Sequence, residues 1–324
     1  MIRIEHESDV GVARRTARDV AIGAGLDEED AGRAALIATE AATNLARHAQ
    51  SGTIFIRPLD AAEGKGVEIL SIDRGPGMAD IERFMTDGVS TRGTAGQGLG
   101  ALRRMADTFA IDSRPGEGTI IVAQNRAGVG PQGFEVGGLI APISEDGCGD
   151  AFAVLPTAGG AAILMVDGLG HGPDAAVAAE AAIDCFRAGK TSDLVAAFET
   201  FNEALKPTRG AAVALAAVDL HGKRVRYVGV GNISGVLHSG AKSRNMVSHN
   251  GIVGHTMRRV QQFEYPLAGK TTIVLHTDGI GTRWQPAALW QRGLSHPAII
   301  AGHLWRAESR GRDDAAIAVL REKA

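Results

Sequence analysis

Two polar residues stand four positions apart in a segment with a helical pattern, the helix expected over residues 27–49. Glu40 and Asn44 therefore share one helix face. The amide oxygen of Asn44 suits Mg²⁺, and the neighbouring Glu40 carboxylate can accept the proton of an attacking hydroxyl. Taken alone, such a pair more often marks a solvated face, so its meaning depends on the segments that follow.

A strand that ends in an acidic residue and leads into a glycine-rich turn comes next. The carboxylate of Asp73 can accept a hydrogen bond from the exocyclic amine of adenine. Gly75 and Gly77 have no Cβ and let the backbone approach the base. Thr119, at the start of a later strand, can complete the adenine contact. These residues predict the base-binding end of a nucleotide pocket.

A second glycine-rich turn opens the helix expected over residues 98–105. Backbone N–H groups at a helix N-terminus form an anion site that suits a triphosphate. The residues of this turn are Gly96, Gly98, Leu99 and Gly100. Each of these pieces is a weak signal alone, but their order and spacing together favour a nucleotide pocket over unrelated turns and a solvated helix face.

Acidic residues recur at predicted strand ends in the second half of the chain: Asp150, Asp167, Asp278 and the pair Asp313 and Asp314. Asp-Gly is also a common hairpin turn. Asp167 and Asp278 fit a hairpin less well, because each follows a fully apolar strand and precedes a glycine-rich loop. Carboxylates that converge at strand ends suit two hard cations, Mn²⁺ or Mg²⁺.

Hydrophobic patterning predicts the elements that position these residues. In the first part of the chain it indicates helices on one face of a mixed or antiparallel sheet. The expected helices cover residues 9–23, 27–49, 79–85 and 98–105, and the expected strands cover 53–59, 67–72, 109–113 and 119–124. Many short strands around two long helices, 173–188 and 193–206, then predict an α/β sandwich. The fold class is α+β with two domains.

A glycine-rich run over residues 126–138 marks the boundary between these parts. We expect a first domain at 1–126, a linker at 127–132 and a second domain at 133–324. With 34 basic and 37 acidic residues the net charge is −3, which argues against nucleic acid as a partner. The apolar runs are far shorter than the roughly 20 residues of a membrane span, and no export signal is visible, so we expect a cytoplasmic protein.

The nucleotide-pocket motifs resemble those of the GHKL ATPase (Bergerat) fold, and within it the RsbT-type anti-sigma-factor and switch-protein serine kinases. The similarity covers residues 5–124. Its motifs are an N-box helix at Glu40–Ala49, a first glycine box at Asp73–Gly77 and a second at Gly96–Gly100. The resemblance implies ATP and Mg²⁺ as cofactors, Asn44 as a Mg²⁺ ligand and Glu40 as the general base.

The second part resembles the PPM (PP2C-type) serine/threonine phosphatases, in their compact SpoIIE and RsbX-type branch. The matching stretches are Cys148–Asp150, Val166–Gly172, Val228–Asn232, His276–Ile280 and Arg312–Ala315. The resemblance implies a catalytic centre of two Mn²⁺ or Mg²⁺ ions that activates water for in-line attack on phosphoserine or phosphothreonine. The implied ligands are Asp150, Asp167, the Gly168 carbonyl, Asp278 and Asp313, with Asp167 and Asp278 as the catalytic pair.

Two positions of this centre stay open at the sequence level. Asp314 stands where the family often has Asn, so Asp313 is taken as the ligand. His171 could protonate the leaving oxygen, but its offset from Asp167 differs from that of the catalytic histidine in the larger phosphatases.

Together the two resemblances predict a bifunctional regulator of a partner-switching or stressosome pathway, a serine/threonine switch kinase fused to its opposing phosphatase. The implied substrate is a STAS-domain antagonist or scaffold phosphoprotein, and a downstream phosphatase or sigma factor is a further partner class. Two alternatives remain. The first domain could sense nucleotide and regulate the phosphatase without phosphorylating anything, or it could sequester a sigma factor or another partner.

Overall fold

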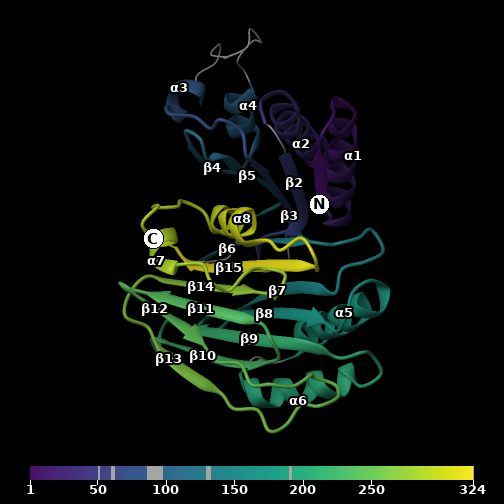
Figure 1. Ribbon diagram of the computed structural model, residues 1–324, viewed down its shortest axis with the longest axis vertical. Helices are drawn as coiled ribbons and strands as arrows, with labels where there is room; N and C mark the ends of the chain where they lie inside the picture. The colour runs from purple at the N-terminus through teal and green to yellow at the C-terminus, as the bar shows by residue number, and fades with distance from the viewer. Residues whose placement is uncertain (50–51, 60–62, 86–97, 129–132, 190–191, 324) are drawn as a thin grey trace. The chain divides into compact units, whose positions relative to one another are not determined.

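The computed structural model describes residues 1–49, 52–59, 63–85, 98–128, 133–189 and 192–323. The chain forms two compact units (Figure 1). The first contains Met1–Gly130 and Leu294–His303, and the second contains Pro131–Gly293 and Leu304–Ala324. Residues 129–132 of the expected linker lie outside the described residues, so the proposed domain limits stay a prediction.

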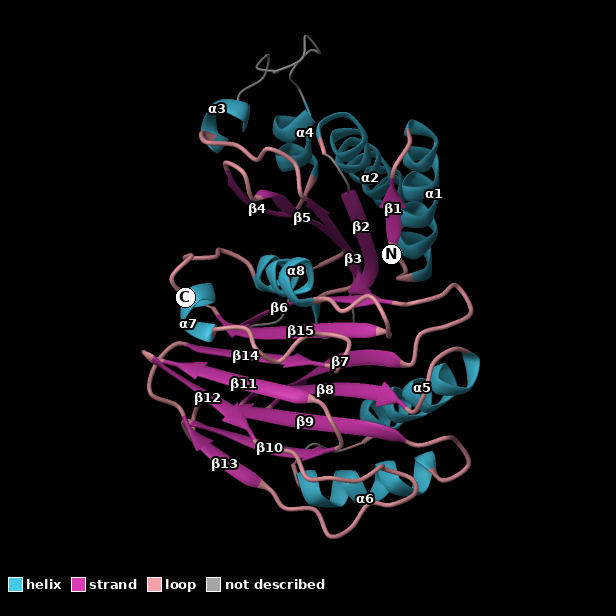
Figure 2. Ribbon diagram, in the orientation of Figure 1, coloured by secondary structure: helices cyan, strands magenta, loops and turns pink. Residues whose placement is uncertain are grey.

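The first unit is built on a five-stranded antiparallel sheet with helices packed against one face (Figure 2). The strand order is β1-β2-β3-β5-β4. The strands are β1 (Ile2–Ile4), β2 (Gly52–Leu59), β3 (Gly66–Asp73), β4 (Thr108–Arg114) and β5 (Gly118–Arg126). The helices are α1 (Glu7–Gly23), α2 (Glu28–His48), α3 (Ile81–Met85) and α4 (Gly98–Met105).

Helix α2 carries the first candidate residues, and its sequence explains both its start and its orientation. The Asp27 carboxylate accepts a hydrogen bond from the Asp30 backbone N–H at 2.9 Å, which caps the helix. A stripe of buried small side chains lets α2 lie close to the sheet: Ala31, Ala34, Ala38, Ala41 and Ala42. Glu40 and Asn44 lie at the border of this stripe and are half-buried.

The second unit is a sandwich of two five-stranded sheets, ordered β13-β10-β9-β8-β7 and β12-β11-β14-β15-β6, in which all neighbouring strands are antiparallel. The strands of the first sheet are β7 (Asp150–Thr157), β8 (Gly160–Gly168), β9 (Ala211–Asp219), β10 (Arg224–Val230) and β13 (Phe263–Pro266). Those of the second are β6 (Phe134–Ala141), β11 (Ser234–Ser239), β12 (Lys242–Met246), β14 (Thr271–His276) and β15 (Ala315–Glu322).

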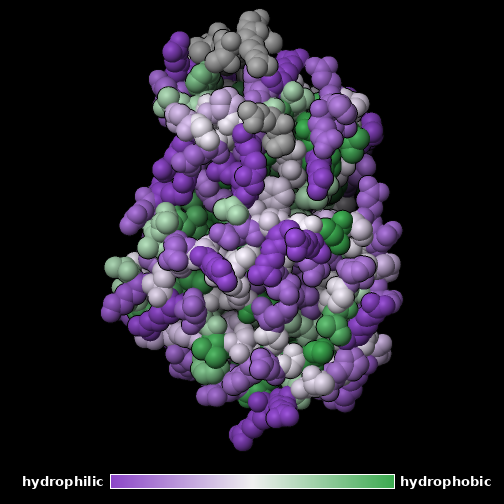
Figure 3. Space-filling view, in the orientation of Figure 1, coloured by the Kyte–Doolittle hydropathy of each residue, from purple (hydrophilic) through white to green (hydrophobic). Residues whose placement is uncertain are grey.

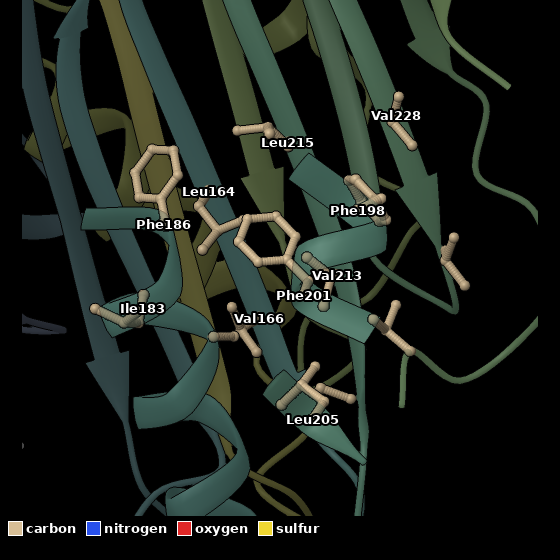
Figure 4. Packing of buried hydrophobic residues seen from close by; sticks show 14 of the residues in the cluster. Leu164, Val166, Ile183, Phe186, Phe198, Phe201, Leu205, Val213, Leu215 and Val228 are labelled. Atoms are coloured by element: carbon tan, nitrogen blue, oxygen red, sulfur yellow. The ribbon is translucent and has the colours of Figure 1, made fainter. Parts of the chain in front are cut away.

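Helices α5 (Pro173–Ala188) and α6 (Leu194–Leu205) cover one face of the first sheet. The shorter helices further along the chain are α7 (Pro286–Trp290) and α8 (Pro297–Glu308). Strand β8 is buried on both faces, because Leu164 and Val166 pack toward α5 and α6 while Ile163 and Met165 pack in the core that includes residues of both sheets. Figure 4 shows the helix-facing cluster, with Ile183, Phe186, Phe198, Phe201 and Leu205 against strand residues.

The predicted α+β fold class, with helices flanking the sheets, is confirmed. Two strands were not predicted. β1 has only three residues, and β12 has the sequence Lys-Ser-Arg-Asn-Met, so neither carries a visible alternating pattern. None of the described helices is both long and apolar enough to cross a membrane. Figure 3 shows hydrophilic side chains over most of the visible face, with hydrophobic ones in small separate groups.

Candidate functional sites in the two units

In the first unit, α2 and the start of α4 bring the predicted catalytic and Mg²⁺-binding residues together. A Cβ built on Gly98 would lie 3.1 Å from Asn44 Oδ1 and 3.4 Å from Glu40 Oε2. The N-terminus of α4 therefore lies directly beside both side chains. Unpaired N–H groups at a helix N-terminus favour anions, so a phosphate group in this place would be near both Asn44 and Glu40.

The base-binding end of the predicted pocket is held by Asp73. Its Oδ1 accepts hydrogen bonds from the backbone N–H groups of Gly75 at 2.7 Å and Thr119 at 3.1 Å. These bonds fix the carboxylate and bring Thr119 beside Asp73. The predicted contact of both residues with adenine stays a prediction. Gly75 also lies against the end of α2, since a Cβ on it would be 3.0 Å from the His48 carbonyl oxygen. Both groups of candidate residues thus meet along α2.

Two glycines at this end have backbone geometry that other residues rarely adopt. Gly77 has φ +67°, and a Cβ there would meet the Arg114 carbonyl oxygen at 1.9 Å. Gly118 has φ +78°, and a Cβ there would lie 2.3 Å from the Asp73 carbonyl oxygen. The close packing of the first glycine box on the β4–β5 turn therefore requires both glycines.

The second glycine box is only partly within the described residues. Gly96 lies outside them, whereas Leu99 and Gly100 lie in the first turn of α4 and are half-buried and buried. Ser113 is a site residue that the sequence did not indicate. Its hydroxyl accepts a hydrogen bond from the Met78 backbone N–H at 2.9 Å and pairs with the Thr119 hydroxyl at 2.9 Å. A lone serine at a strand end carries no signal that would have revealed this role.

In the second unit, the acidic site begins with two carboxylates placed opposite each other. Asp150, the first residue of β7, is the cross-strand partner of Asp167, near the end of β8. Residues directly opposite in an antiparallel pair lie on the same face with Cβ atoms about 5 Å apart, and like charges there are destabilising. The sequence predicted convergence at strand ends, and the register brings these two side chains together.

The electrostatics of the pair reflect this crowding. Burial, followed by the charge of Asp167, raises the pKa of Asp150 to about 8. Burial, followed by the charges of Asp278 and Asp313, raises the pKa of Asp167 to about 7. The main charges that act on both groups are other carboxylates, so the site concentrates negative charge in a largely buried place.

Thr277 connects this pair to the second sheet. Its hydroxyl donates to Asp150 Oδ2 at 2.6 Å and accepts from the Ala316 backbone N–H at 2.8 Å. Asp278, which follows it, is half-buried, and its Oδ2 accepts a hydrogen bond from Asn232 Nδ2 at 2.8 Å. Neither Thr277 nor Asn232 was predicted as a site residue. Both stand within matched motifs, but a hydroxyl or an amide there gave no separate signal.

The adjacent pair Asp313 and Asp314 divides into two environments. Asp314 is buried, and its two oxygens accept hydrogen bonds from the backbone N–H groups of Ile143 at 2.7 Å and Gly149 at 2.8 Å. It therefore holds the loop that leads into Asp150. Asp313 is exposed, its Oδ1 accepts the Asp314 backbone N–H, and its charge raises the pKa of Asp167. Both oxygens of Asp314 are thus bonded to backbone groups, and the choice of Asp313 as the ligand stays a prediction.

Gly168 completes the turn from β8 toward α5. A Cβ on it would lie 2.3 Å from the Ala175 carbonyl oxygen, so only glycine allows this approach. Its own carbonyl oxygen lies 3.1 Å from the Cβ position of Gly149, the residue before Asp150. His171 is exposed, and whether it acts as an acid stays a prediction.

The donor set suits hard divalent cations, although no three His, Cys, Asp or Glu side chains of the described residues already stand in a metal-binding arrangement. Hydrogen bonds from neutral donors or backbone groups hold Asp150, Asp278 and Asp313. A buried excess of carboxylate charge is stabilised by protonation or by a cation. Oxygen ligands of this kind are those that Mg²⁺ and Mn²⁺ prefer.

Fold and sites together define a histidine kinase-like ATPase domain joined to a PP2C-type phosphatase domain. A family model described as "Histidine kinase-like ATPase domain" matches residues 5–124. The model "Stage II sporulation protein E (SpoIIE)" matches residues 157–321, just over half of the chain. The chain belongs to the SpoIIE family.

Two curated relatives from Bacillus subtilis (strain 168) match different parts of the chain. "Serine/threonine-protein kinase RsbT" is 38% identical over 122 residues, which cover 38% of this chain and 92% of the relative. "Phosphoserine phosphatase RsbX" is 24% identical over 146 residues, which cover 44% of this chain and 73% of the relative. The resemblance of the two halves to RsbT-like and RsbX-like proteins is therefore confirmed.

Solved structures resemble the phosphatase part. A chain from "The bacterial stressosome: a modular system that has been adapted to control secondary messenger signaling" has a TM-score of 0.55 and 29% identity, over 58% of this chain and 99% of that one. Magnesium-bound RsbX has a TM-score of 0.54 and 19% identity, over 60% of this chain and 98% of that one. The second likeness concerns the fold alone.

Proposed function

We propose that the second unit is a metal-dependent phosphoserine/phosphothreonine protein phosphatase. The observation that carries the proposal is the like-charged cross-strand pair of buried Asp150 and half-buried Asp167, which costs stability unless a cation or a proton neutralises it. Asp150, Asp167, the Gly168 carbonyl, Asp278 and Asp313 would hold two Mn²⁺ or Mg²⁺ ions. When bound, such ions supply a hydroxide nucleophile and stabilise the charge of a transferring phosphoryl group.

The residues of this chain have separate tasks in that reaction. Asp150 and Asp167 provide the charge that attracts the cations, and Thr277 orients Asp150 through its hydroxyl. Asp314 keeps the loop before Asp150 in place through two backbone N–H groups. Rigid support of this kind maintains ligand geometry and is as necessary as the ligands themselves.

The phosphatase is tested by hydrolysis of a serine-phosphorylated STAS-domain protein, with p-nitrophenyl phosphate as a second substrate. Hydrolysis should require added Mn²⁺ or Mg²⁺, stop in EDTA and collapse in the variant Asp167→Asn. The matched control is Asp184→Asn, the same substitution at an exposed position of α5. Hydrolysis that persists in EDTA, or in Asp167→Asn at the level of the control, would refute the proposal.

We also propose that the first unit is an ATP-dependent serine/threonine kinase of a STAS-type partner. It is supported by Glu40 and Asn44 against the N-terminus of α4 and by the similarity to a protein named as a serine/threonine kinase. Asn44 would coordinate the Mg²⁺ of ATP, and Glu40 would accept the proton of the attacking hydroxyl. A chain with both activities would set the phosphorylation level of one partner in a partner-switching pathway.

The kinase is tested with labelled ATP and candidate STAS-domain proteins. Glu40→Ala should retain ATP binding and lose phosphotransfer by roughly 10²–10⁴-fold, the contribution typical of a general base. Glu29→Ala, at an exposed position of the same helix, is the matched control. Full transfer by Glu40→Ala would remove Glu40 from the mechanism.

The two other functions considered above are outcomes of the same experiment. ATP binding without transfer, combined with a phosphatase rate that changes with ATP, would indicate a nucleotide sensor. Tight binding of a sigma factor or other partner without transfer would indicate sequestration.

A further inference from the structure

We propose that Asn232 is a positioning residue of the metal centre, whose neutral amide group donates hydrogen bonds to both Asp167 and Asp278 and so holds carboxylates from the two sheets together for shared cation binding. The proposal rests on the phosphatase function proposed above. It concerns a residue that coordinates nothing itself in this assignment and acts through the two carboxylates.

The position of Asn232 in the fold makes this bridge possible. Strand β10 belongs to the first sheet and β11 to the second, so the chain crosses from one sheet to the other at residues 231–233. Asp167 lies near the end of β8 in the first sheet, and Asp278 follows β14 in the second. Asn232 stands at the crossing, between an acidic residue of each sheet.

The amide bonds to one carboxylate and acts on the second. Asn232 Nδ2 donates to Asp278 Oδ2 at 2.8 Å. The Asn232 side chain also lowers the pKa of Asp167, against the burial and the neighbouring charges that raise it. A side-chain amide has two N–H donors, so a second donor remains beside the bond to Asp278.

The backbone around Asn232 is held tightly, which an orienting residue requires. Gly231 has φ +101°, and its N–H donates to the His249 carbonyl oxygen at 2.8 Å. A Cβ on Gly231 would lie 2.3 Å from the Cβ of Ala212, which is the β9 partner of Asp167. Gly231 therefore packs directly on the strand next to Asp167 and places the backbone of Asn232 near that residue.

An amide suits this task better than a charged side chain would. A lysine or arginine could bridge two carboxylates, but its positive charge would repel the cations that the site must bind. An aspartate would add negative charge and offer no donor at neutral pH. A carboxylate accepts at about four lone-pair positions, so one amide proton on each leaves acceptor capacity for metal ions.

The decisive measurement is Mn²⁺ binding to the full chain by calorimetry, without any substrate. Asn232→Ala should weaken Mn²⁺ affinity by about 10–100-fold, the range seen when residues that orient metal ligands are removed. Asn232→Gln keeps both donors on a longer side chain and should retain more affinity than Asn232→Ala. Asn245→Ala, at an exposed position of β12, is the matched control and should bind Mn²⁺ as the wild type does.

Hydrolysis of p-nitrophenyl phosphate separates positioning from substrate contact. If Asn232 positions the ligands, excess Mn²⁺ should restore most of the activity of Asn232→Ala, with KM for the substrate unchanged. Wild-type Mn²⁺ affinity in Asn232→Ala would overturn the proposal, whether or not activity falls.

The failure of the proposed function gives a different result. A wild type that binds Mn²⁺ but hydrolyses no phosphoprotein would remove the phosphatase function, and the calorimetry of Asn232→Ala would still decide whether the amide positions the ligands. A wild type that binds no Mn²⁺ would overturn the metal centre and this proposal with it.

Discussion

Asp150 and Asp167 face each other across β7 and β8, an arrangement that weakens a sheet. Among the residues that the structure describes, no basic side chain pairs with either carboxylate to relieve the repulsion. The surroundings hold single oxygens with neutral donors, as Thr277 does for Asp150 and Asn232 does for Asp278. Local instability of this kind is characteristic of functional sites, where a ligand supplies the missing charge.

The metal-free protein should therefore lose stability as pH rises. Burial and neighbouring carboxylates raise the pKa to about 8 for Asp150 and about 7 for Asp167 in the folded state, against about 3.9 for an ordinary aspartate, so the folded state keeps protons that the unfolded chain releases. The stability from these protons is fully present below about pH 4 and is lost as pH rises through 7 and 8. In EDTA, the melting temperature should be lower at pH 8.5 than at pH 5.5.

Two comparisons isolate this effect from the rest of the protein. In EDTA, the melting temperature of Asp167→Asn should depend less on pH than that of Asp184→Asn. The reason is that Asp167→Asn removes one of the two carboxyl groups whose pKa is raised. Added Mn²⁺ should raise the melting temperature of the wild type more at pH 8.5 than at pH 5.5. Equal pH dependence in both variants would contradict the assignment.

A second prediction at this scale concerns Asp73. Its Oδ1 already accepts two backbone N–H groups, and Asn could keep these bonds while presenting an NH₂ group to the adenine amine. A donor facing a donor leaves a buried polar group unpaired, at a cost of about 1–3 kcal/mol. Calorimetry should show weaker ATP binding for Asp73→Asn. The control is Asp19→Asn, the same substitution at an exposed position of α1. Unchanged affinity would remove Asp73 from the adenine site.

At the scale of elements, the sheet of the first unit contains a row of buried polar side chains that crosses three strands. Arg57 of β2 is the cross-strand partner of Glu68 of β3, and Glu68 is the partner of Gln124 of β5. Arg57 Nε donates to Glu68 at 2.8 Å, and its two terminal nitrogens donate to Glu63 at 2.9 and 2.8 Å. Gln124 Nε2 donates to the other oxygen of Glu68. All four carboxylate oxygens of Glu63 and Glu68 therefore accept a hydrogen bond from Arg57 or Gln124.

Loss of Arg57 should destabilise this sheet strongly. Arg57→Ala leaves the buried carboxylates of Glu63 and Glu68, which are 2% and 1% exposed, without their main cation. Breaking a buried pair in this way costs about 3–5 kcal/mol. Arg18→Ala removes an exposed pair with Glu28, and such pairs contribute about 0–1 kcal/mol. Equal free energies of unfolding in urea for the two variants would show that the buried pairs of Arg57 stabilise the protein no more than the exposed pair of Arg18.

At the scale of the whole molecule, the two activities proposed above predict a cycle if one chain has both. With a STAS-domain partner, ATP and a divalent metal, the wild type should release inorganic phosphate continuously, because the phosphatase regenerates the substrate of the kinase. Asp167→Asn should convert about one ATP to ADP per partner site and release almost no inorganic phosphate, and Glu40→Ala should produce neither ADP nor phosphate in the cycle. Parallel assays of ADP and of inorganic phosphate distinguish the three. Steady phosphate release by Asp167→Asn would mean that the phosphate does not come from the phosphatase site, and a wild type that stops after one round would mean that the two activities do not share a substrate.

The sequence alone determined the elements and most of the candidate residues, because their signals are local. Apolar periodicity located the long helices and the fully apolar strand of Asp167, and the first glycine box located a turn that needs a missing Cβ, as Gly77 now shows. The short β1 and the polar β12 were missed because three residues, or a polar edge strand, carry no period.

What only the tertiary structure decided is which groups meet across the two sheets. The register of β7 on β8 makes Asp150 and Asp167 cross-strand partners. The two oxygens of Asp314 accept hydrogen bonds from backbone N–H groups, whereas Asp313 is exposed. Asn232, which follows a strand of the first sheet, reaches Asp278 of the second because the chain changes sheets there. These contacts join residues dozens of positions apart, and the spacing of residues along a chain holds no information on a hydrogen bond formed only after distant strands pack.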